Sequence, residues 1–169
     1  MPRQLSRRFV MVGAAGLTAG CGFHPLYGSG VAQRDLAAVQ ISLIPDRAGQ
    51  LLRQALQQRF DRGQAVPKRF SLDVSYGVAG DAIGVQQDST STRVREIATA
   101  TWFLKDLNPE RTLVVSGAAR ALDGVNVVDQ QYFAADLEGE AATRRAAERI
   151  ADQITQQLAS YFARRSTAS

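Results

Sequence analysis

The sequence predicts an α+β fold in which two helices pack on one face of a mostly antiparallel four-stranded sheet, in the order β-α-β-β-β-α. Two periodicities indicate this fold. Several segments between residues 70 and 133 alternate apolar and polar residues, as antiparallel strands with one buried face do. Residues 49–60 and 141–164 instead repeat apolar residues every three or four positions, which is typical of amphipathic helices. A chain of 169 residues has the usual length of a single domain.

Residues 1–20 are predicted to be a signal peptide and not part of the fold. Three arginines precede a short apolar stretch, and small residues lead directly to Cys21. A buried N-terminal helix is the alternative, but three glycines disfavour it because each costs up to about 1 kcal/mol in a helix. The segment resembles a bacterial lipoprotein signal, which is cleaved before a cysteine that is then acylated. The pair Arg7-Arg8 leaves twin-arginine export open beside the general secretory route.

The folded domain is predicted over residues 36–164, between a lipid-anchored tether at 21–35 and a flexible tail at 165–169. Pro25, Gly28 and Gly30 indicate the tether because they are unfavourable in regular elements. The expected order is a strand at 39–44, a helix at 49–60, a strand at 70–78 with a glycine-bent continuation to 85, a hairpin tip at 86–92, a strand at 94–104, a turn at 108–109, a strand at 113–119, a turn at 123–124 that precedes residues 125–133, and a helix at 141–164.

Composition argues against several classes of function. One cysteine excludes a disulfide framework and a multi-cysteine zinc site, and one histidine disfavours a histidine-based metal site or nucleophile relay. Removal of residues 1–20 leaves 17 basic against 16 acidic residues, because that segment holds three of the 20 Lys and Arg and no Asp or Glu. A nearly neutral body argues against general nucleic-acid binding. No metal, cofactor or catalytic residue is therefore expected.

Arg93 and Arg95 are the candidate ligand-binding residues. Arg93 immediately precedes the strand at 94–104 and Arg95 lies within it, so both side chains share one face beside a polar hairpin tip. Paired arginines at such a place suit phosphate groups. The alternative is an ordinary solvated sheet face, which is commonly charged. His24 is expected to be a linker residue. Glu96 would be a site candidate if buried, although pairing with a nearby arginine or a position near the sheet edge would explain it.

Three acidic residues stand just before the predicted last helix. Acids at that place complement the positive N-terminal end of a helix dipole, which explains them without catalysis. They are Asp136, Glu138 and Glu140.

Residues 21–27, Cys-Gly-Phe-His-Pro-Leu-Tyr, resemble the mature start of the LPS-assembly lipoprotein family (LptE-like). The segment from Tyr132 through the apolar positions of the last helix, and the β-α-β-β-β-α order, are also similar to that family. The resemblance implies a non-catalytic protein that plugs the lumen of the LptD β-barrel, helps that barrel to fold and assists delivery of lipopolysaccharide to the outer leaflet. It also implies that lipopolysaccharide phosphates suit Arg93 and Arg95, and that Gly22, in place of an aspartate, directs the protein to the outer membrane, anchored through Cys21 on the periplasmic side.

Two other functions remain open from the sequence. One is an accessory lipoprotein of another envelope lipid-transport system, which would copurify with inner-membrane transport components. The other is a lipid-anchored periplasmic hydrolase, which would need a deep pocket holding two carboxyl groups with raised pKa values.

Overall fold

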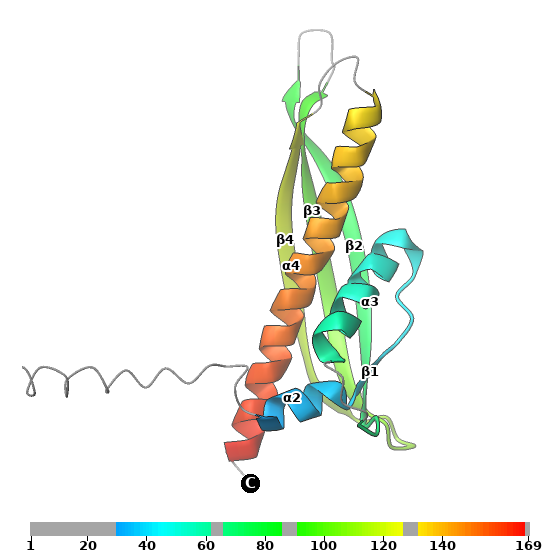
Figure 1. The fold of residues 1–169 in the computed structure, drawn as a ribbon, viewed down its shortest axis with the longest axis vertical. Coiled ribbons are helices and arrows are strands. Elements are labelled where there is room, and N and C mark those ends of the chain that lie inside the picture. Colours follow the sequence, from blue (N-terminus) through cyan, green and yellow to red (C-terminus); the bar gives the residue numbers. More distant parts are fainter. Residues whose placement is uncertain (1–29, 62–65, 86–90, 127–131, 168–169) are drawn as a thin grey trace, which may run out of the picture.

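The computed structural model describes residues 30–61, 66–85, 91–126 and 132–167 and confirms the α+β fold (Figure 1). Within these ranges the elements are α2 (Gly30–Ala37), β1 (Val39–Ile41), α3 (Asp46–Phe60), β2 (Phe70–Val85), β3 (Ser91–Asp106), β4 (Leu113–Asn126) and α4 (Tyr132–Thr167).

The four strands form one sheet in the order β1-β2-β3-β4. The short strand β1 runs parallel to β2, whereas β2, β3 and β4 are antiparallel neighbours. The β2–β3 ladder extends from Phe70 opposite Asp106 to Val85 opposite Ser91, and its register shifts on either side of Gly84. The predicted irregularity of β2 is therefore found at Gly84, in keeping with the tendency of glycine to mark bulges in strands.

The helices lie on one face of the sheet (Figure 1). The 36-residue helix α4 follows the whole length of β3 and β4. Helix α3 packs beside α4 and over β1 and β2, and α2 packs against α4 at the opposite end from the β2–β3 hairpin. No helix of the described ranges covers the other face of the sheet. We call the hairpin end the tip and the α2 end the base.

The core is built from the residues that the two periodicities predict. Leu72, Trp102 and Leu104 face the helices from β2 and β3 and are fully or almost fully buried. The helices contribute a matching row of fully buried or nearly buried residues, among them Leu52, Leu56, Phe60, Ile150, Ile154, Leu158 and Phe162. This apolar contact between helix stripe and sheet face supplies the main driving force for folding.

Gly117 allows Trp102 to lie flat against β4. A Cβ atom on this glycine would stand 2.5 Å from Trp102 Cζ2 and 3.0 Å from Gln157 Oε1. The Trp102 indole N–H donates to the same Gln157 oxygen at 3.1 Å. Glycine is therefore needed here because a large aromatic side chain occupies the space that any other side chain would take.

Four local expectations differ from the structure. Residues 30–35, which sequence analysis assigns to the tether, belong to α2, whose Ala32 and Leu36 are buried. Strand β1 ends at Ile41 and does not reach 44. The turn at 123–124 is wrong, because β4 continues through both residues with Gly124 paired to Arg95. The last helix begins earlier than expected, since β4 ends at Asn126 and α4 begins at Tyr132, not at 141.

Candidate functional site

The structure describes one of the three predicted site residues in full. Cys21 and the linker candidate His24 lie outside the described residues. Arg93 belongs to the backbone ladder of β3, opposite Gly84 on β2 and Asn126 on β4, but its side chain is not described. Arg95 is described completely and lies on the helix-free face, as the alternation predicts.

Arg95 is already paired with an acidic residue. Its Nη2 donates to Asp81 Oδ2 at 2.6 Å, directly across the β2–β3 ladder. Both side chains are about half exposed, so water screens the pair and it contributes little to stability. A phosphate that bound Arg95 would have to compete with Asp81.

A second charged group of the tip lies on the opposite, helix-covered face. Asp123 of β4 accepts from Arg145 of α4 at 2.9 Å and lies 3.9 Å from Arg149. Its carboxylate also accepts from the Gly124 N–H at 2.9 Å. Burial opposes ionisation of Asp123, but the hydrogen bonds from Arg145 and Gly124 and the two arginine charges outweigh it, so its pKa lies below its ordinary value.

Glu96 faces the same side as Asp123 and is less well satisfied. Its Oε2 is buried and has no hydrogen-bond partner among the described residues. Burial, and next the charge of Asp123, raise the pKa of Glu96, although Arg145 and Thr143 act in the opposite sense. The expected explanations do not hold, because β3 is a central strand and the neighbouring Arg145 pairs with Asp123.

Tyr76 on β2 completes this polar group. Its hydroxyl oxygen is buried and likewise unpartnered within the described part of the chain. Burial and the charge of Glu96 raise the pKa of Tyr76 to about 12. Tyr76 therefore stays protonated at neutral pH, as a hydrogen-bond donor near the Glu96 carboxyl group.

The acids expected before the last helix lie inside it, because α4 begins at Tyr132. Glu140 is contacted by Arg47 of α3 and lies 3.8 Å from Arg144, one turn further along α4. It therefore bridges two helices and does not cap a helix end.

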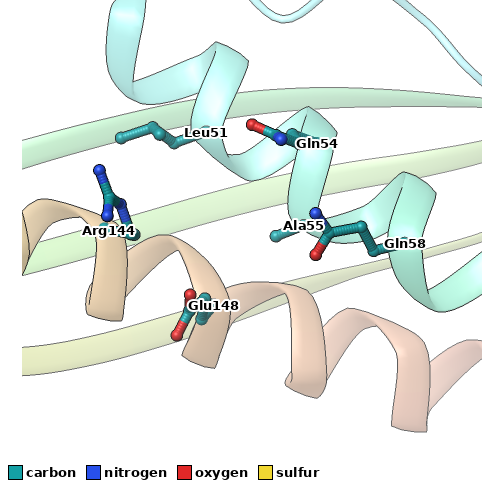
Figure 2. Close-up of a pocket in the computed structure, with 6 residues that line it drawn as sticks. All are labelled: Leu51, Gln54, Ala55, Gln58, Arg144 and Glu148. Carbon is teal, nitrogen blue, oxygen red and sulfur yellow. The ribbon is translucent and has the colours of Figure 1, made fainter.

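A shallow groove separates α3 from α4 (Figure 2). Figure 2 shows Leu51 and two glutamines on the α3 side, facing Arg144 and Glu148 of α4. The six residues that line it are Leu51, Gln54, Ala55, Gln58, Arg144 and Glu148. One acid, one base and two amides could hold a polar chain, but they contain no nucleophile.

Side chains of α4 bind the outer edge of β4, a feature that sequence analysis missed. Gln153 donates to the Arg120 carbonyl at 2.9 Å and accepts from the Arg120 N–H at 3.1 Å. Gln157 donates to the Ala118 carbonyl at 3.0 Å, and Arg149 donates to the Leu122 carbonyl at 2.6 Å. We call these contacts the edge ladder. The four-residue spacing of 149, 153 and 157 is the signal that could have indicated it.

The described residues contain neither a candidate metal centre nor a membrane-spanning helix. No group of three or more His, Cys, Asp or Glu residues in these ranges could hold a metal ion. None of the helices in the described part of the chain combines the length and the apolar character needed to cross a membrane.

Solved structures with the same architecture are lipoproteins. A Caulobacter crescentus CB15 protein assigned as a lipoprotein is 22% identical, with a TM-score of 0.65 over 78% of this chain and 96% of its own. Rare lipoprotein B from Shewanella oneidensis is 13% identical, with a TM-score of 0.52 over 73% and 92% of the two chains. Lipoprotein B from Nitrosomonas europaea is 12% identical, with a TM-score of 0.56 over 74% and 82%. At such identities the likeness establishes the fold.

No curated protein matches the chain. The family model described as LptE, lipopolysaccharide-assembly, matches residues 36–158, which is well over half of the sequence and spans every described strand. This extent of match and the shared fold lead to one conclusion: the chain belongs to the LptE family of lipopolysaccharide-assembly lipoproteins.

Proposed function

We propose that this protein is anchored by acyl chains on Cys21 to the periplasmic side of the outer membrane, where it plugs an LptD-like β-barrel, assists its assembly and supports lipopolysaccharide delivery. The family match over residues 36–158 carries the proposal. The elongated body, with helices on one face of a long sheet, supports a role in contact and not in turnover.

Purification of the tagged, membrane-extracted protein followed by mass spectrometry tests this function. We expect an outer-membrane β-barrel to copurify and the N-terminal peptide to begin at an acylated Cys21. A Cys21→Ser variant should lose the acyl mass, because the acyl chains are proposed to be attached at Cys21. It should also lose membrane retention, because stable anchoring needs more than one acyl chain. Copurification of inner-membrane transport components without a β-barrel would favour another envelope lipid-transport system.

We further propose that Arg93 and Arg95 contribute to binding lipopolysaccharide phosphates. Asp81 provides a test of this proposal, because its carboxylate accepts a hydrogen bond from Arg95 and would compete with a bound phosphate. Asp81→Asn should therefore tighten binding of purified lipopolysaccharide, whereas Arg93→Ala with Arg95→Ala should weaken it, more at low than at high salt. Arg120→Ala is the matched control, because Arg120 is exposed on the same sheet face but lies on β4. Equal loss in the control would indicate general charge attraction.

A further inference from the structure

The two outer edges of the sheet differ in how their backbone groups are satisfied. On β4 the backbone groups that bind α4 side chains belong to residues 118, 120 and 122, so the N–H and C=O groups of even-numbered residues point outward, away from β3. The edge ladder occupies both the N–H and the carbonyl of Arg120 and the carbonyls of Ala118 and Leu122. An incoming strand would have to displace α4 side chains before it could pair with β4.

The opposite edge belongs to β2, because β1 covers only its first three residues. The Phe70 N–H donates to Ala38 and the Leu72 carbonyl accepts from Ser42, so even-numbered residues of β2 point toward this edge. The next outward-pointing residues are Val74, Tyr76 and Val78. Their outward N–H and C=O groups have no hydrogen-bond partner in the described ranges. Figure 1 shows β2 continuing toward the tip beyond β1.

This open edge of β2, residues 74–80, also lacks the features by which proteins block unwanted strand pairing. Its sequence, Val-Ser-Tyr-Gly-Val-Ala-Gly, contains no charge and no proline. The register shifts of β2 begin only after Ala82, so the edge is regular over these seven residues. The helix-free face presents Ser75, Gly77 and Ala79, which are exposed and small, and a Cβ on Gly77 would meet no atom within 4 Å.

Tyr76 of this edge strand turns its side chain toward the helix-covered face, where its hydroxyl is buried. The Tyr76 hydroxyl has no partner among the described residues, although buried hydroxyl groups are normally hydrogen-bonded. This hydroxyl lies on the helix-covered face, so an occupant of the edge would instead bind the outward main-chain groups of Val74, Tyr76 and Val78.

We propose that the open edge of β2 binds an extended segment of a partner protein, which joins the sheet as an added strand in line with β1. Exposed strand edges are recognised in this way through main-chain hydrogen bonds. A second copy of this chain fits less well. If two copies paired antiparallel about Gly77, residues 82–84 of one copy would need the space that β1 of the other copy occupies beside residues 70–72. The binding mode stands by itself, whereas the identity of the partner as a β-barrel rests on the proposed function.

Hydrogen exchange of the full-length protein tests the proposal. The peptide covering residues 74–80 should exchange with a fast component in the purified protein and lose that component in intact outer membranes, where the partner is present. The Arg120 amide, already bonded to Gln153, should change little. Identical exchange of residues 74–80 in both preparations would overturn the proposal, whichever protein copurifies. Protection that depends on the concentration of the purified protein would instead identify a second copy as occupant.

A proline variant provides an independent measurement. Val78→Pro removes an N–H that points to the open edge and leaves the β2–β3 hydrogen bonds intact, so thermal unfolding should change little. Recovery of the partner should fall about tenfold, as expected for the loss of a backbone hydrogen bond and the blocking of its neighbours. Ser116→Pro is the matched control, because its N–H points outward from β4. Equal recovery with both variants would contradict the proposal, and exchange of the unaltered protein decides the matter if Val78→Pro fails to fold.

Discussion

The base and the tip share the same strands but are packed differently. At the base, α2, α3 and α4 bury bulky side chains such as Trp102, Phe60 and Phe162 against the sheet. Toward the tip, the buried positions of β3, β4 and α4 hold alanines, including Ala98, Ala121 and Ala146, and the polar residues Tyr76, Glu96 and Asp123 lie beside them. Most of the stabilising apolar area is therefore at the base, and the tip keeps polar groups at the expense of stability.

Replacement of Trp102 should have the largest effect on this comparison. Trp102→Ala empties a buried site at the base and removes the hydrogen bond to Gln157, so we expect a loss of about 3–5 kcal/mol in the free energy of unfolding. Urea denaturation measures it. Phe103→Ala is the control, because Phe103 faces the other side of the sheet and is 39% exposed. Similar losses for the two variants would show that the base does not dominate stability.

Gly117→Ala should have the next largest effect. The new methyl group would overlap Trp102, and relief of that overlap by shifts of the ring or strand should cost about 1–3 kcal/mol. Gly77→Ala, at an open position of β2, should be neutral or slightly stabilising, and urea denaturation of both variants measures the difference. A neutral Gly117→Ala would mean that Trp102 has room to move.

The edge ladder joins the base to the tip, and its loss should have a smaller effect. Gln153→Ala leaves both backbone groups of Arg120 without their partner, which should cost about 1–2 kcal/mol. It should also open the β4 edge to strand pairing, so light scattering should detect concentration-dependent association. Gln156→Ala, an exposed neighbour on α4, should show neither change. Monomeric behaviour of Gln153→Ala at all concentrations would argue against the protective role.

Glu96→Gln should have the smallest effect and the most informative pH dependence. Burial and the charge of Asp123 raise the pKa of Glu96 above its ordinary value of 4.5, so the folded protein holds this proton more tightly than the unfolded chain. The contribution of Glu96 to stability is thus lost as pH rises through 4.5 and the higher folded-state pKa. The variant should be more stable than the natural protein at neutral pH, with the difference shrinking toward pH 4.

Asp123 titrates in a different range, so the two carboxyl groups can be separated. Its pKa lies below its ordinary value of 3.8, and its stabilising contribution is therefore lost only as pH falls below that value. Between pH 4 and 8, the difference in the free energy of unfolding between Glu96→Gln and the natural protein therefore reports mainly the ionisation of Glu96, because Asp123 titrates at lower pH. An unchanged pH profile in Glu96→Gln would contradict the assignment of the tip as a strained polar region.

The sequence predicts the fold where its periodicity is regular. The alternation around Leu72 and Trp102 and the helical stripe through Ile154 correctly indicate the strands, the last helix and their buried faces. Prediction from the sequence fails where local signals disagree with tertiary structure. Asp123-Gly124 is a common turn pair, but here the Asp123 carboxylate bonds the Gly124 N–H within a continuing strand. Helix α2 is missed because its glycine start indicates a tether, although α4 and α3 pack against it and its apolar side is buried.

The candidate site is less predictable than the fold. The outward position of Arg95 follows from alternation, but its pairing with Asp81 depends on the register of the β2–β3 hairpin, which residue pattern alone does not set. The same holds for Gln153 and Gln157, because an exposed polar residue on a helix does not reveal which backbone group it contacts. Parallel pairing of β1 with β2 is also not visible in the sequence.

The edge ladder has a consequence for insertions and deletions. Each contact advances four residues along α4, about 6.0 Å, and two residues along β4, about 6.7 Å, so helix and strand remain in step from Arg149 to Gln157. One residue inserted into α4 between these contacts would rotate the following side chains by about 100° away from the strand. Variants of altered length should therefore be tolerated when four helical residues are added together with two strand residues, and not when either segment grows alone.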